Sequence, residues 1–219
     1  MSFRLKKFDL STLNPHSSIL IIGKRYTGKI TLVNDIIHHS NIPAGIALSS
    51  VPGRIKSKTS KVLEYDDCKS IYDLQKCIIK RQKLANNKYR EDKSFDPRTF
   101  VIFNQCFDDN IFRKSEYIKT IFFNNRNYNI LLITVVQYPL LMPPAIRSNI
   151  DYVFIFRDNY IQNQKKIYKY YADMIPSFEL FSRFFEHCNN DYECLVINNT
   201  RNSRKIEDMI FWYKADLYK

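Results

Sequence analysis

The 219-residue sequence has only four glycines, and no apolar run in it approaches the roughly 18 residues that a membrane-spanning helix needs. Its first sixteen residues carry early positive charge without a following apolar segment, so they do not have the pattern of a signal peptide. The five cysteines are an odd number and form no CxxC pair, which indicates neither a disulfide framework nor a zinc site. These absences argue against a membrane or secreted protein and favour reduced, intracellular thiols.

Acidic residues are also scarce. There are 22 Asp and Glu against 34 Lys and Arg, which gives a net charge of +12 and a pI near 9.4. Such a surface attracts polyanions, with nucleic acid as the first candidate, although for any single basic group a solvated surface is the favoured explanation. The basic residues recur in local groups: Arg4, Lys6 and Lys7; Arg54, Lys56, Lys58 and Lys61; Lys80, Arg81, Lys83, Lys88 and Arg90; and Arg201, Arg204 and Lys205.

The order of apolar segments predicts an α/β fold, a mostly parallel sheet with helices on both faces. We expect a single domain over residues 1–219, with a basic lead-in at 1–13, a surface loop at 52–60 and a C-terminal segment at 205–219 that packs on the core. Short apolar runs predict strands at Ile19–Ile22, Ile46–Leu48, Thr99–Phe103, Ile130–Val136, Tyr152–Phe156 and Tyr192–Ile197. Helical spacing predicts helices at Thr31–His39, Ser70–Leu84, Lys114–Phe123, Ile161–Tyr171 and Ser177–His187.

Two of the glycines flank a candidate phosphate-binding loop between the first strand and the first helix. Glycines let the backbone N–H groups of such a loop point at phosphates, and the helix N-terminus adds a favourable dipole. Lys29 would reach the β- and γ-phosphates of a nucleotide such as ATP. The alternative is an ordinary glycine-containing turn between strand and helix. The loop reads Gly23, Lys24, Arg25, Tyr26, Thr27, Gly28, Lys29, Ile30 and Thr31.

The residues that would hold Mg²⁺ in such a site are missing. The position after the lysine should be Ser or Thr, but it is Ile30, and Thr31 points about 100° further round the helix. A pair of acids should end a neighbouring strand, but Asn104 and Gln105 stand there. We expect Asp108 and Asp109 to cap the next helix, with a catalytic role as the alternative. The sequence therefore assigns no metal ligand, puts Mg²⁺ binding in doubt and predicts weak or absent hydrolysis.

Ordered motifs over nearly the whole chain resemble one family, the DNA-packaging ATPases of nucleo-cytoplasmic large DNA viruses. This is the poxvirus-type branch of the FtsK/HerA group of P-loop ATPases. Asn104-Gln105-Cys106 stands where the family carries Asp-Asp-Cys. The other segments that carry the resemblance are Ile21–Lys29, Gln137–Pro139, Arg147–Phe154, Ile167–Phe178, Asp191–Ile197 and Phe211–Ala215.

The resemblance implies a RecA-like core, a ring of subunits and ATP-driven movement of duplex DNA into a capsid. It places Gln137 as the polar sensor of the γ-phosphate, with a plain strand-end hydrogen bond as the alternative. It makes Arg147 the candidate arginine finger that reaches a neighbour's nucleotide. Arg126 is a second candidate, but a surface or interface salt bridge is the favoured role for it.

The departures from the family concern the metal chemistry more than the scaffold. Tyr26 replaces a glycine, Ile30 a serine, and Asn104 and Gln105 acids, while Asn125 and Asn127 stand where the family tends to have Gly and His. Three hypotheses remain: a weak or inactive family member, an active motor with unusual ligation by Thr31 and Asp108 or Asp109, and a DNA-binding virion component without nucleotide. The expected partners are double-stranded DNA, capsid or other virion proteins, and a ring of its own copies or an active paralogue. The expected location is the viral factory in the host cytoplasm, the virion, or both.

Overall fold

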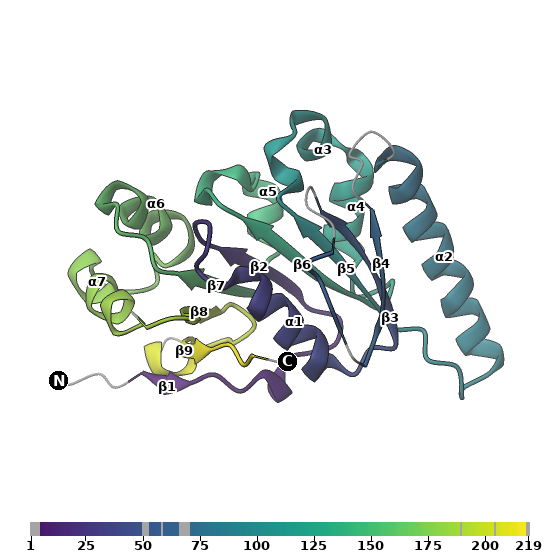
Figure 1. The fold of residues 1–219 in the computed structure, drawn as a ribbon, viewed down its shortest axis with the longest axis horizontal. Coiled ribbons are helices and arrows are strands. Elements are labelled where there is room, and N and C mark those ends of the chain that lie inside the picture. Colours follow the sequence, from purple (N-terminus) through teal and green to yellow (C-terminus); the bar gives the residue numbers. More distant parts are fainter. Residues whose placement is uncertain are drawn as a thin grey trace.

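The computed structural model describes residues 5–49, 53–57, 59–65, 71–188, 190–203 and 205–217. Within these residues a nine-stranded sheet has the order β1-β9-β8-β7-β2-β6-β5-β3-β4 and carries helices on both faces (Figure 1). This confirms the predicted α/β class and the mostly parallel, RecA-like sheet. No helix in the described part of the chain is long and apolar enough to cross a membrane. Four residues named above lie outside the described residues: Arg4, Lys58, Ser70 and Arg204.

Strands and helices alternate along much of the described chain, although α3 and α4, and α6 and α7, follow each other directly. The strands are β1 (Lys6–Lys7), β2 (Ser18–Ile22), β3 (Ala44–Ser49), β4 (Lys61–Tyr65), β5 (Thr99–Asn104), β6 (Ile130–Val136), β7 (Tyr152–Phe156), β8 (Glu193–Asn198) and β9 (Ile210–Lys214). The helices are α1 (Lys29–Ser40), α2 (Ile71–Glu91), α3 (Asn110–Lys114), α4 (Glu116–Asn124), α5 (Pro144–Arg147), α6 (Ile161–Tyr171) and α7 (Phe178–His187).

The direction of the strands decides which loops meet at one edge of the sheet. Strand β2 pairs in parallel with β6 and β7, and β5 pairs in parallel with β6 and β3. Strand β8 alone runs against both of its neighbours, β7 and β9. The start of β8 therefore lies at the edge where β2, β5 and β6 end, and residues far apart in the sequence converge there.

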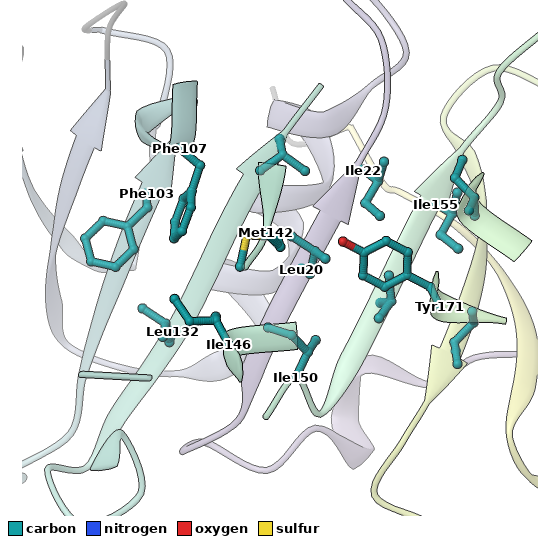
Figure 2. Packing of buried hydrophobic residues seen from close by; sticks show 14 of the residues in the cluster. Leu20, Ile22, Phe103, Phe107, Leu132, Met142, Ile146, Ile150, Ile155 and Tyr171 are labelled. Carbon is teal, nitrogen blue, oxygen red and sulfur yellow. The ribbon is translucent and has the colours of Figure 1, made fainter. Parts of the chain in front are cut away.

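The central strand β2 is buried throughout, and its residues Ile19–Ile22 are all apolar because both faces of the sheet are covered. Successive side chains of a strand point to opposite faces, so Ile19 and Ile21 join one core cluster and Leu20 and Ile22 the other. The first cluster includes apolar side chains of α1. Figure 2 shows the second cluster, in which Leu20 and Ile22 lie near Met142 and Tyr171. Because its side chains are buried in a core cluster on each face of the sheet, the end of β2 is fixed in position, and the phosphate loop starts there.

Two helix predictions were wrong in their limits. Helix α2 continues to Glu91 instead of ending near Leu84, and residues distant in sequence bind its polar extension. The Nδ2 of Asn86 donates to the carbonyl of Asn127 at 2.9 Å, and the Oδ1 of Asn86 accepts from the side chain of Asn129 at 2.7 Å. The helix expected at 114–123 is α4, which begins at Glu116, and Ser115 separates it from the short helix α3 that was not predicted.

Strand β4 was missed within the stretch that follows the expected loop at 52–60. Its side chains alternate between exposed and half-buried, and none of them is fully buried. It is an edge strand that pairs only with β3, and edge strands need little apolar surface. Its sequence, Lys61-Val62-Leu63-Glu64-Tyr65, lacks the strict alternation of apolar and polar residues and therefore gives a weak strand signal.

Gly45 in β3 lies opposite Phe100 in β5, and a Cβ added there would lie 2.1 Å from the Phe100 ring. We expect Gly45→Ala to lower the free energy of unfolding by about 1–3 kcal/mol, because a fully buried ring must move. Urea denaturation measures this. In the double variant Gly45→Ala/Phe100→Leu, the free energy of unfolding should fall by less than the sum of the falls in the two single variants. The difference should be about 0.5 kcal/mol or more. Strict additivity would contradict the proposed clash.

Candidate phosphate-binding site

The loop from Gly23 to Gly28 leaves the end of β2 and turns directly into α1. The N–H of Gly23 donates to the carbonyl of Val136 at 3.2 Å, which ties the loop to β6. The hydroxyl of Thr27 donates to the carbonyl of Lys24 at 2.8 Å and closes the turn. Gly28 precedes α1 with a φ of 102°, and a Cβ there would lie 2.8 Å from the ring of Tyr192. Only glycine suits both this backbone conformation and this close contact.

Lys29 places a charged group inside the loop. Its side chain is buried, and its Nζ donates to the carbonyl of Lys24 at 2.5 Å. Burial, and after it the nearby Arg25 guanidinium, lowers the pKa of Lys29 from 10.5 to about 8. The ammonium is thus protonated at neutral pH but is poorly solvated, and an anion entering the loop would relieve that cost.

The side chain of Lys24 is held outside the loop. Its Nζ lies 2.7 Å from Oδ1 of Asp158 and 3.6 Å from the centre of the Tyr160 ring. Asp158 is itself buried and also accepts from the N–H of Tyr160 and from the side chain of Asn163, both at 2.8 Å. These contacts hold the start of the loop against the segment that follows β7. The Lys24 carbonyl, in contrast, accepts hydrogen bonds from Thr27 and Lys29 within the loop.

A cleft of about 550 Å³ opens over the loop. Six of the nine loop residues proposed from the sequence line it, while Gly23, Lys24 and Thr27 do not. Tyr26 also has a positive φ and is 99% exposed, so its ring lies in solvent rather than in the loop. Among the described residues that line the cleft, none is Asp or Glu. The lining comprises Arg25, Tyr26, Gly28, Lys29, Ile30, Thr31, Arg54, Gln105 and Tyr192.

The sequence did not identify two of these residues, Arg54 and Tyr192, as part of the site. Arg54 follows β3, and its carbonyl accepts from the side chain of Asn34 on α1 at 3.5 Å. Tyr192 directly precedes β8 and reaches the cleft because β8 runs against β7. Membership of a basic group was the only signal for Arg54, and nothing in the sequence reveals the direction of β8.

Asn104 is the last residue of β5 and Gln105 follows it, but the two side chains have different surroundings. Gln105 lines the cleft, with a φ of 62° and its N–H bonded to the carbonyl of Val135 at 3.0 Å. Asn104 is buried, and its Nδ2 donates to the hydroxyl of Ser49 at 2.8 Å. Strand β6 lies between β5 and β2, so the expectation of directly neighbouring strands was wrong.

The two acids that follow do not enter the cleft. Oδ1 of Asp109 accepts from the N–H of Phe112 at 3.0 Å, which is the capping contact expected for the next helix. Asp108 is exposed. In the described part of the chain, no group of three or more His, Cys, Asp or Glu side chains could hold a metal ion. The described residues that line the cleft fit the phosphates of ATP, but none of them offers Mg²⁺ the carboxylate that it prefers, so they do not fit the metal ion.

The other proposed site residues lie at different places. Gln137 follows β6 and is half-buried, next to Val136, whose carbonyl accepts from the loop. The guanidinium of Arg147 lies over the ring of Tyr170 at 4.5 Å, and its role toward a neighbour's nucleotide stays a prediction. Arg126 forms an ion pair with Asp151, which accepts from the N–H at the start of β2. Arg126 thus has the salt bridge that was favoured for it, at the edge opposite the loop.

Comparison with known proteins gives relatives in large DNA viruses. No family model matches the chain. The uncharacterised protein L437 of Acanthamoeba polyphaga mimivirus is 30% identical over 97% of this chain and 78% of its own length. The uncharacterised proteins 088R of Invertebrate iridescent virus 3 and 075L of Invertebrate iridescent virus 6 are each 33% identical over 85% of their lengths, and cover 98% and 96% of this chain.

Solved structures share the fold at lower identity. The DNA-packaging ATPase B204 of Sulfolobus turreted icosahedral virus has a TM-score of 0.63 and 17% identity, over 94% of this chain and all of that chain. The type VII secretion ATPase EccC of Thermomonospora curvata has a TM-score of 0.60 and 11% identity, over 90% of this chain and 25% of that chain. By these viral relatives, the chain belongs to a family of uncharacterised proteins of large DNA viruses, and it shares the fold of the DNA-packaging ATPase B204.

Proposed function

We propose that this protein binds ATP in the cleft over Gly23–Thr31, binds duplex DNA during virion assembly, and hydrolyses ATP weakly or not at all. One observation carries the proposal: the buried Lys29 ammonium faces a cleft whose lining has cations but no carboxylate among the described residues. A site of this kind favours a phosphate chain, and it lacks the groups that activate water.

Two further observations support nucleotide and DNA as ligands. Structures of B204 from Sulfolobus turreted icosahedral virus 2, which has this fold, are complexes with AMP, ATP-gammaS and AMPPCP. The net charge of +12 favours binding to duplex phosphates, with the salt dependence that counterion release produces. The proposed partners are therefore DNA, virion proteins, and further copies of this chain or an active paralogue in a ring, at the viral factory or in the virion.

The proposal of weak hydrolysis rests on three side chains. Ile30 offers no hydroxyl to Mg²⁺ at the position after Lys29. The amide of Gln105 lines the cleft but is not a useful proton acceptor. Asn104 is also neutral and is bonded to Ser49. Together these residues leave the attacking water without a general base and the phosphates without a metal.

An active motor is the second candidate, because Thr31 lines the cleft together with Ile30. In this case the Thr31 hydroxyl replaces the missing ligand. Asp108 and Asp109 do not support it, since neither lines the cleft. A DNA-binding virion component without nucleotide is the third candidate, and the absence of nucleotide binding would favour it.

Turnover of ATP with Mg²⁺, with and without duplex DNA, tests the proposed loss of hydrolysis. We expect the unmodified protein to turn over ATP no faster than Lys29→Ala, because both lack a complete reaction centre. We expect Ile30→Ser/Asn104→Asp/Gln105→Asp to be faster by about 100-fold or more, since it regains a hydroxyl and two carboxylates. Phosphate release measures both. DNA-stimulated turnover of the unmodified protein well above Lys29→Ala would instead establish the active motor.

The affinity for ATP should fall as the pH rises through about 8. Phosphate favours protonated Lys29, whose pKa is about 8 in the free protein, so binding above that pH must take up a proton. The expected loss approaches about tenfold per pH unit. Calorimetry between about pH 7 and pH 9.5 measures it, in a range where the terminal phosphate stays ionised. Lys29→Ala should bind more weakly and lose this slope, and an equal slope in that variant would exclude Lys29 as its source.

A further inference from the structure

We propose that the cleft binds the phosphates of its nucleotide without Mg²⁺, and that the guanidinium groups of Arg25 and Arg54 supply the positive charge that a metal ion supplies elsewhere. The inference rests on the proposed function and specifies the form of nucleotide that the site takes. It starts from a disagreement: the fold family implies Mg²⁺, but Ile30 and Gln105 occupy the cleft where its ligands belong.

The backbone around Arg54 is held by the side chains of Asn34 and Glu64. The Asn34 side chain on α1 donates to the Arg54 carbonyl at 3.5 Å and accepts from the N–H of Lys56 at 3.1 Å. The Glu64 carboxylate on β4 accepts from the N–H groups of Gly53 and Ile55. The segment 53–56 is thus attached to both α1 and β4, and it presents an arginine to the cleft.

Arg25, which lies in the loop itself, contributes a second positive charge to the cleft. It lines the cleft, and its charge lies near enough to Lys29 to contribute to the low pKa of that ammonium. The positive charges of Arg25, Lys29 and Arg54 are thus brought together over one loop. Such a cluster is unfavourable without an anion and is relieved when one binds.

The nearby carboxylates are engaged elsewhere. Asp158 pairs with Lys24 outside the loop, and Glu64 is occupied by backbone N–H groups. Among the described residues neither Arg25 nor Arg54 forms an ion pair. Their guanidinium groups are therefore available to phosphate oxygens, which they bind with paired, charge-assisted hydrogen bonds. A Mg²⁺ ion would bring two more positive charges into this cluster, and the lining residues that the structure describes include no carboxylate to offset them.

Calorimetry of the full chain with ATP, in EDTA and in Mg²⁺, tests the inference. We expect ATP to bind in EDTA at least as tightly as in Mg²⁺. In EDTA, Arg54→Ala and Arg25→Ala should each weaken ATP binding by about tenfold. The matched control is Arg90→Ala, which removes the same charge from the exposed last turn of α2 and should leave the affinity unchanged.

A gain of metal dependence provides the complementary measurement. We expect Ile30→Ser/Gln105→Asp to bind ATP more tightly in Mg²⁺ than in EDTA, because it places a hydroxyl and a carboxylate in the cleft. Thermal unfolding of each variant identifies one that fails to fold. Binding of ATP by the unmodified protein only when Mg²⁺ is present would overturn the inference but leave the proposed nucleotide binding intact. Equal weakening by Arg90→Ala would overturn the role of the two arginines, and no binding in either buffer would overturn the proposed function as well.

Discussion

The contact between the Lys29 ammonium and the Lys24 carbonyl is the interaction on which the rest of the site depends. It holds a poorly solvated positive charge within a loop that has no acid to neutralise it. The left-handed backbone of Gly28 brings the chain into this position, and the start of β8 packs against that glycine. The site is therefore a positively charged cleft before any ligand enters, and an anion would improve its electrostatic energy.

Local patterns were enough to predict the frame of the molecule. The apolar run at Ile19–Ile22 can be buried only by covering both sheet faces, and the glycine spacing after it favours the loop. Features that depend on distant partners were not predictable. The extension of α2 beyond Leu84 carries bonds from Asn86 to residues some 41 and 43 positions away, and β4 pairs along a single edge without an alternating apolar pattern.

The composition of the site depends on sheet order, which the sequence does not reveal. Tyr192 reaches the cleft because β8 is antiparallel, and Arg54 because Asn34 holds its segment to α1. Asn104 and Gln105 are adjacent and chemically alike, but one is buried against Ser49 and the other faces the cleft. The left-handed turn at Gln105 separates them, and residue type alone does not predict that conformation at this position.

The burial of Asn104 limits which residues its position accepts. A carboxylate there would be enclosed with Ser49 as its side-chain donor, and an unpaired buried charge is strongly unfavourable. Asn104 does not line the cleft, so a cation among bound phosphates would not contact such a carboxylate directly. The neutral amide is therefore the more stable residue here, and Asn104→Asp alone is expected to destabilise the fold. The two adjacent amides thus differ in consequence: Gln105 bears on the chemistry of the cleft, whereas Asn104 bears on the stability of the sheet beside it.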